Sequence, residues 1–236
     1  MVFWSIPAAA NNLTAVMAGK GEEIMQEFEA LEKIYRKHLQ KVSSLDATGI
    51  EELLAIDSNE NGIEVPVFGF PHQVTPGGIT NHLGEKPGQF LGVILCKYLL
   101  GCPAIKPRGD DWVTYKDFQD STPFVEAFMN NIERPVAEYF SGRLADLETA
   151  CNKLGASTID VGVSSDLAKV FYALPQIPVL MLLNDQDEDL PATCSILFER
   201  RAAIYLDMEC LAMLGMLLFE WLRLCDPSFN TTNTSN

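Results

Sequence analysis

The sequence predicts an α+β fold in which antiparallel hairpins pack with several helices in a single domain. Apolar residues recur at helical spacing in some segments and alternate in others, and the two patterns follow each other irregularly. The strand–helix–strand rhythm of a parallel sheet is absent. A chain of 236 residues is long enough to bury about 70% of its unfolded surface in one core.

Three segments have the pattern of long helices. Gly21–Val42 carries one apolar stripe, with His38 at its edge as a structural residue. Gln89–Leu100 is almost wholly apolar and precedes Gly101, while residues 207–225 are rich in leucine. We expect the last two helices to be buried. Shorter helices are expected to begin at Thr122-Pro123, at Pro135 and at Leu144.

Two segments predict β-hairpins. In residues 53–67 apolar residues alternate on both sides of Asn61-Gly62, a pair that favours a tight turn. Pro66 and Pro71 lack the backbone N–H, so their strands should be edge strands or bulged. A second, longer hairpin joins the apolar runs 174–183 and 192–198 through an acidic tip. Residues 159–163 alternate like a further strand.

Charge and composition restrict the partners and the compartment. The formal net charge of −15 argues against nucleic acid and anionic lipid as partners. No apolar run reaches the roughly 20 residues that cross a bilayer. Six cysteines without paired spacing indicate reduced thiols in the cytoplasm. We expect a flexible N-terminal leader over residues 1–20, one domain over 21–226 and a disordered tail over 227–236.

The residues for catalysis or metal binding do not form a complete set. His38, His72 and His82 are scattered, so no Cys/His zinc spacing exists, and no cofactor is expected. Ser164, Ser165, Cys194 and His82 are the noticeable parts of a nucleophile–base pair, but none has the surrounding motif. A hydrolase-like enzyme for a small molecule, with an acidic pocket, therefore stays open as an alternative.

The candidate binding residues are an aromatic pair and an acidic group. Trp112 and Tyr115 lie in a short aromatic connection, and such residues are enriched at interfaces. Asp187, Glu188 and Asp189 form the tip of the long hairpin. The tip lacks the spacing of a calcium loop, so no metal is expected there. A solvated tip and a partner-docking loop both remain open.

The order of several short motifs resembles an uncharacterised family of anaerobic prokaryotes that is known only as a domain of unknown function. The resemblance covers roughly residues 50 to 222. Two positions depart from the family pattern, with Tyr115 in place of phenylalanine and Asn184 in place of tryptophan. The matching segments are Val65-Pro66-Val67-Phe68-Gly69, Lys97-Tyr98-Leu99-Leu100, Trp112-Val113-Thr114-Tyr115, Leu174-Pro175-Gln176-Ile177-Pro178, Asp187-Glu188-Asp189-Leu190-Pro191, Ile196-Leu197-Phe198 and Tyr205-Leu206.

This resemblance implies an accessory or binding role in anaerobic redox or corrinoid one-carbon metabolism, with an iron–sulfur or corrinoid protein as partner. It transfers no catalytic residue. The chain has no cluster-binding set of cysteines of its own, so the metal centre would belong to the partner. The oligomeric state is left open by the sequence.

Overall fold

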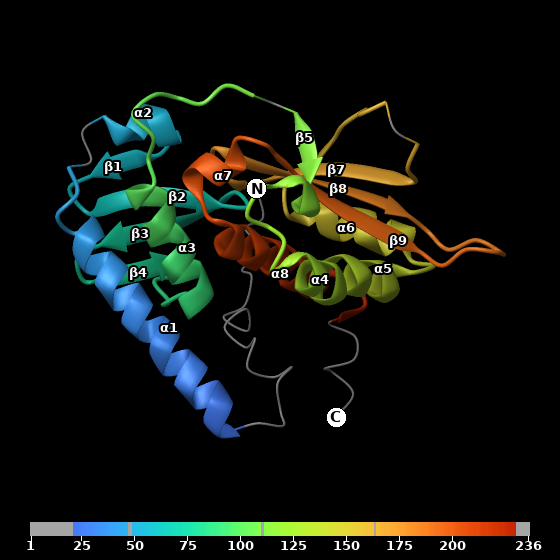
Figure 1. The fold of residues 1–236 in the computed structure, drawn as a ribbon, viewed down its shortest axis with the longest axis horizontal. Helices are drawn as coiled ribbons and strands as arrows, with labels where there is room; N and C mark the ends of the chain where they lie inside the picture. Colours follow the sequence, from blue (N-terminus) through green and yellow to red (C-terminus); the bar gives the residue numbers. More distant parts are fainter. Residues whose placement is uncertain (1–20, 47–48, 110, 163, 230–236) are drawn as a thin grey trace.

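The computed structural model describes residues 21–46, 49–109, 111–162 and 164–229, which form two antiparallel sheets and the helices packed against them (Figure 1). The predicted α+β class and single domain are confirmed. The leader expected over residues 1–20 and most of the tail expected over 227–236 lie outside the described residues.

The first sheet has four strands in chain order. They are β1 (Asp57–Asn59), β2 (Gly62–Val67), β3 (Phe70–Thr75) and β4 (Gly78–Asn81). The predicted first hairpin is present, because Asn59 pairs with Gly62 across a turn in which Gly62 has a φ of +125°. Its first strand begins later than predicted, at Asp57, because residues up to Leu54 form helix α2 (Ile50–Leu54). A few alternating residues are compatible with either structure.

The two prolines lie in β2 and β3, which are the inner strands of this sheet. The prediction that their strands lie at an edge is therefore wrong. Pro66 and Pro71 are Cα partners of each other in β2 and β3. The pairing of β1 with β2 stops at Glu64, and that of β4 with β3 stops at His72. Neither proline therefore faces a third strand that would need its missing N–H.

The tip of the β2–β3 hairpin connects the two sheets. Phe68 and Gly69 both have positive φ, 45° and 81°, as a tight two-residue turn requires. The Phe68 N–H donates to the Ala173 carbonyl of the second sheet at 3.2 Å. The hairpin tip is thus fixed to a strand more than 100 residues later in the chain.

The second sheet has five strands in the order β5-β9-β8-β7-β6. The long hairpin with an acidic loop is confirmed as β8–β9. The run 174–183, predicted as one strand, is divided by a turn at Pro175-Gln176. The strand predicted at 159–163 is wrong over residues 159–162, because β6 ends at Thr158, and residue 163 lies outside the described residues. The strands are β5 (Trp112–Thr114), β6 (Ser157–Thr158), β7 (Leu167–Leu174), β8 (Ile177–Asn184) and β9 (Thr193–Glu199).

The long helices agree with the sequence. Helix α1 (Gly21–Val42) packs on α3 (Gln89–Leu100), and α3 and α8 (Met208–Cys225) are largely buried as predicted. Asp207 caps α8 by accepting a hydrogen bond from the Cys210 N–H. No helix among the described residues is long and apolar enough to span a membrane.

The middle helices differ from the prediction in their boundaries. Helix α4 (Val125–Phe128) continues through the π-helical turn η4 (Met129–Glu133) into α5 (Arg134–Phe140) without a break. The helix start expected at Thr122-Pro123 is wrong, because the chain first makes a turn in which the Phe124 N–H donates to the Ser121 carbonyl and α4 begins at Val125. Helix α6 (Leu144–Lys153) follows as expected, and Gly155 beyond it has a φ of +70°.

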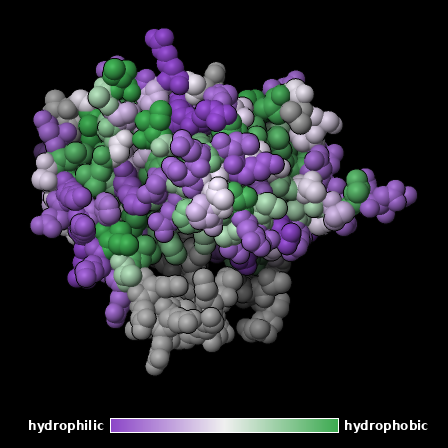
Figure 2. Space-filling model, in the orientation of Figure 1, coloured by the Kyte–Doolittle hydropathy of each residue, from purple (hydrophilic) through white to green (hydrophobic). Residues whose placement is uncertain are grey.

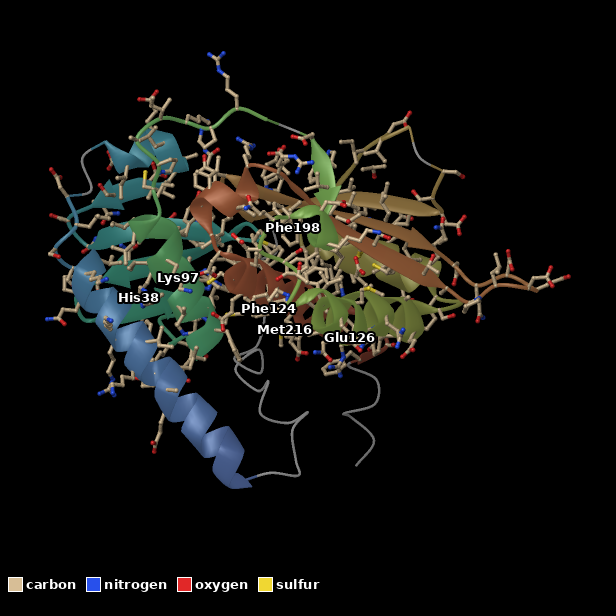
Figure 3. All side chains as sticks on the ribbon, in the orientation of Figure 1. His38, Lys97, Phe124, Glu126, Phe198 and Met216 are labelled. Atoms are coloured by element: carbon tan, nitrogen blue, oxygen red, sulfur yellow. The ribbon has the colours of Figure 1, made fainter. Side chains whose placement is uncertain are left out.

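Helices α4, α5, α6 and α8 lie on one side of the five-stranded sheet (Figure 1). Phe198 of β9 and Phe124 at the start of α4 are labelled in Figure 3. Phe198 is fully buried against this helical layer, with its ring 6.3 Å from that of Phe128. The main core therefore occupies this side of the sheet.

Candidate interaction surface

Strand β9 connects the aromatic and acidic candidates and holds them apart. Trp112 pairs with Glu199, the last residue of β9, whereas the acidic loop precedes Thr193, its first residue. A strand of this length spans about 20 Å. The structure therefore places Trp112 and the loop at opposite ends of one strand instead of in one compact site.

Tyr115 lies in the 3₁₀ turn η3 (Tyr115–Asp117) and is buried. Its hydroxyl donates to the Met208 carbonyl at 2.7 Å. Its ring stacks on Phe128 with the ring centroids 4.1 Å apart. These contacts show that Tyr115 attaches η3 to α4 and α8, so its side chain is not available to a partner. The Trp112 side chain, in contrast, is partly exposed.

Asp187 organises the acidic loop from within. Its Oδ1 accepts hydrogen bonds from the backbone N–H groups of Asp189, at 2.9 Å, and Leu190, at 2.8 Å. The Asp187 N–H donates to the Leu190 carbonyl at 3.0 Å. The two backbone hydrogen bonds lower the pKa of Asp187. Its carboxylate is therefore already engaged by the loop backbone.

The base of the loop is attached to the turn between α5 and α6. Asp185 Oδ1 accepts from the Gly142 N–H at 2.7 Å and from the Gln186 N–H at 2.8 Å. Ser141 Oγ donates to Gln186 Oε1 at 2.9 Å. These side-chain contacts hold both the base and the tip of the loop in one conformation.

Three exposed residues remain at the tip. The carboxylates of Glu188 and Asp189 point to solvent, and Leu190 is 65% exposed. Figure 2 shows the loop projecting from the molecule with a hydrophobic residue among hydrophilic ones. An ordered loop with two carboxylates and one aliphatic side chain suits contact with a basic and apolar surface.

The candidates for catalysis do not form a site. No hydrogen bond joins any two of Ser164, Ser165, Cys194 and His82 among the described residues. His82 stacks on Phe70 in the four-stranded sheet. Burial raises the pKa of Cys194 well above the ordinary range of a thiol, which disfavours the reactive thiolate.

Metal binding has no support from the described part of the chain. Within that part, no three histidine, cysteine or acidic side chains are grouped so that they could hold a metal ion. Asp187, Glu188 and Asp189 are included in that statement, and the Asp187 carboxylate is turned toward the loop backbone. The loop thus lacks the converging oxygen ligands that a hard cation needs.

Sequence reasoning missed the residues that fix this surface. Asp185 precedes the acidic tip in the sequence, but its carboxylate accepts a hydrogen bond from a turn 43 residues earlier in the chain. Tyr172, 60% exposed on β7, belongs to no predicted strand or candidate site. The alternation of Lys169 and Tyr172 across β7 was the available signal, because successive strand residues point to opposite faces.

The fold and this surface define an α+β protein without an assembled catalytic or metal site among its described residues. Residues 46–221 match a family model, and the chain belongs to the family described as "Domain of unknown function (DUF3786)". The resemblance to a family of unknown function is thereby confirmed. Comparisons with curated proteins and with solved structures gave no match.

Proposed function

We propose that this chain is an accessory protein that binds a partner protein through the acidic β8–β9 loop. The ordered geometry of that loop carries the proposal, because binding then costs little conformational entropy. Asp185 and Asp187 are used to hold the loop, and Glu188, Asp189 and Leu190 are left for contact. We place this function in the cytoplasm, where the six thiols stay reduced.

The family resemblance supplies the class of partner. It supports an iron–sulfur or corrinoid protein of anaerobic redox or one-carbon metabolism. This chain would then contribute recognition, and the partner would hold the metal centre. The alternative of a small-molecule hydrolase has no comparable support, because its candidate residues lie in separate elements: His82 follows β4, Ser164 and Ser165 precede β7, and Cys194 lies in β9.

The proposal is tested by comparing the wild-type chain with the Glu188→Gln/Asp189→Asn double variant. Both chains are immobilised and exposed to an extract of the source organism, and retained proteins are quantified by mass spectrometry. We expect a protein with bound iron–sulfur cluster or corrinoid to be enriched at least tenfold on the wild type and lost on the variant. A matched Glu126→Gln variant on α4 should retain it. Equal retention by all three chains contradicts the proposal.

Elemental analysis of the purified chain gives an independent check. We expect no transition metal at stoichiometric occupancy, because the loop lacks converging ligands. A metal that copurifies with the wild type and is absent from the double variant would replace the docking function by a metal-dependent one.

A further inference from the structure

The Tyr205 hydroxyl is a buried polar group that no other group among the described residues pairs. The residue is only 2% exposed. It ends the short helix α7 (Ala202–Tyr205), which lies between the two sheets (Figure 1). Nearly all buried polar groups in folded proteins have a hydrogen-bond partner, so this hydroxyl points to a partner from outside the chain.

Arg201 supplies a second hydrogen-bond donor beside this hydroxyl. It precedes Tyr205 by four residues, the spacing that puts two side chains on one face of a helical turn. Burial raises the pKa of Tyr205 and the positive charge of Arg201 opposes that rise, so the two groups are electrostatic neighbours. Arg201 Nε donates to Glu199, and Nη1 makes a long contact of 3.5 Å with Gln176 Oε1. Its Nη2 has no acceptor within the described ranges.

The residues around these two donors are already fixed by other contacts. The Tyr98 ring lies 5.9 Å from that of Tyr205, and its hydroxyl is used by the Leu54 carbonyl and the Gln176 N–H. The end of α3, the β7–β8 turn, the end of β9 and α7 therefore meet here. The Arg201 side chain is 19% exposed, so the group of residues reaches the surface at the guanidinium.

Two neighbouring donors that lack acceptors are matched by the two oxygens of a carboxylate, which the planar guanidinium fork binds well. The ion pair with Glu199 leaves the Nη2 side of Arg201 available for a second carboxylate. Arg143 shows that one guanidinium in this chain holds two carboxylates at once. Its Nε donates to Asp146 Oδ2 at 3.0 Å, while its Nη2 donates to Asp226 Oδ1 at 2.7 Å.

We propose that Tyr205 and Arg201 bind the carboxylate group of a small molecule, with one oxygen on the Tyr205 hydroxyl and the other on Arg201 Nη2. This site lies at the end of β9 that is remote from the acidic loop, because Glu199 is the last residue of that strand and the loop precedes its first residue. It is therefore separate from the partner-binding surface. An unpaired buried hydroxyl lowers the stability of the free chain, and such departures from good packing are typical of functional sites.

Thermal unfolding tests this site with acetate as the probe and acetamide, its neutral isostere, as the matched control ligand. At neutral pH and constant ionic strength, acetate should raise the Tm of the wild-type chain by mass action, and acetamide should not. In Tyr205→Phe the affinity for acetate should fall by about tenfold, because a hydrogen bond to a charged group is lost. Arg201→Lys keeps the charge without the planar fork and should also weaken acetate binding. Tyr172→Phe removes the hydroxyl of an exposed tyrosine and should bind like the wild type.

Three results overturn the proposal. Equal stabilisation of the wild type and Tyr205→Phe by acetate would show that the anion acts elsewhere. The absence of any acetate response in the wild type would mean that the Tyr205 hydroxyl bonds only to an ordered water. An equal response to acetamide would rule out the carboxylate as the recognised group. None of these results involves the Glu188→Gln/Asp189→Asn variant, so this site and the docking function are tested separately.

Discussion

Asp185 accepts a hydrogen bond from the Gly142 backbone N–H at 2.7 Å, and this contact joins the β8–β9 loop to the turn between α5 and α6. The same carboxylate oxygen accepts from the Gln186 N–H. The acidic loop is therefore an extension of the packed structure and not a free tip. A partner that contacts Glu188 or Asp189 meets a loop whose conformation is already selected.

Replacing Asp185 by alanine should loosen this loop. Two exposed backbone N–H groups lose their acceptor and bond to water instead, so the free energy of unfolding should fall by only about 0.5–1.5 kcal/mol. Hydrogen exchange of the loop amides should accelerate. Asp189→Ala is the control, because its carboxylate makes no comparable backbone contact, and it should leave exchange in the loop unchanged. Equal exchange in both variants would show that Asp185 does not hold the loop.

His72 should make stability depend on pH. Burial lowers the pKa of His72 to about 4, and the nearby His82 acts in the same direction, while the Phe70 carbonyl opposes it. The unfolded value is about 6.5. Between the two values the unfolded chain binds the extra proton, so stability is complete above pH 6.5 and falls as the pH falls toward 4.

The measurement is chemical unfolding between pH 7.5 and pH 4.5. The expected contribution of His72 is on the order of 2–3 kcal/mol across that range. In His72→Gln the pH dependence should become weaker, whereas in His82→Gln, the exposed neighbour, most of it should persist. A His72→Gln variant with the pH dependence of the wild type would refute the assignment.

The cysteines should be reduced and protected in the folded chain. All six are free thiols, and four are buried, with burial raising the pKa of Cys96 to about 12 and that of Cys225 to about 11. Thiol titration should give six groups in denaturant and fewer in the native protein, since buried neutral thiols react slowly. A denatured count below six that rises after reduction would reveal a disulfide.

The sequence predicted elements whose signal is local and long. Gly21–Val42 and Gln89–Leu100 have the predicted bounds, because many successive apolar positions agree on one helical period. The prediction is wrong at Leu54, Thr122 and residues 159–162, where a few residues are compatible with more than one structure and tertiary contacts decide between them. The helix predicted over residues 207–225 is present as α8, and Asp207 caps its start by accepting a hydrogen bond from the Cys210 N–H.

The candidate surface could be predicted only in part. The acidic hairpin is a local feature and was recognised from composition. Which side chains share one face of the five-stranded sheet depends on which strands are neighbours, and β5 pairs with β9 although about 80 residues separate them in the chain. Such long-range pairing leaves little local signal, so Tyr172 and Leu197 could not be assigned to one face with Trp112.

A final prediction compares two buried tyrosines. The Tyr98 hydroxyl donates to the Leu54 carbonyl at 2.9 Å and accepts from the Gln176 N–H at 3.2 Å, so it bridges helix α2 and the β7–β8 turn. The Tyr205 hydroxyl is also buried but has no hydrogen-bond partner in the described part of the chain. Tyr98→Phe should leave two buried backbone groups unpaired and lower the free energy of unfolding by about 2 kcal/mol.

Tyr205→Phe is the matched control, because it removes the same atom from a ring 5.9 Å away without removing a hydrogen bond. It should be neutral or stabilising, since an unpaired buried hydroxyl is itself unfavourable. Urea unfolding of the two variants and the wild type separates these effects. If Tyr205→Phe lowers the free energy of unfolding as much as Tyr98→Phe does, the prediction is wrong. The Tyr205 hydroxyl would then make a stabilising hydrogen bond to an ordered water or a bound molecule.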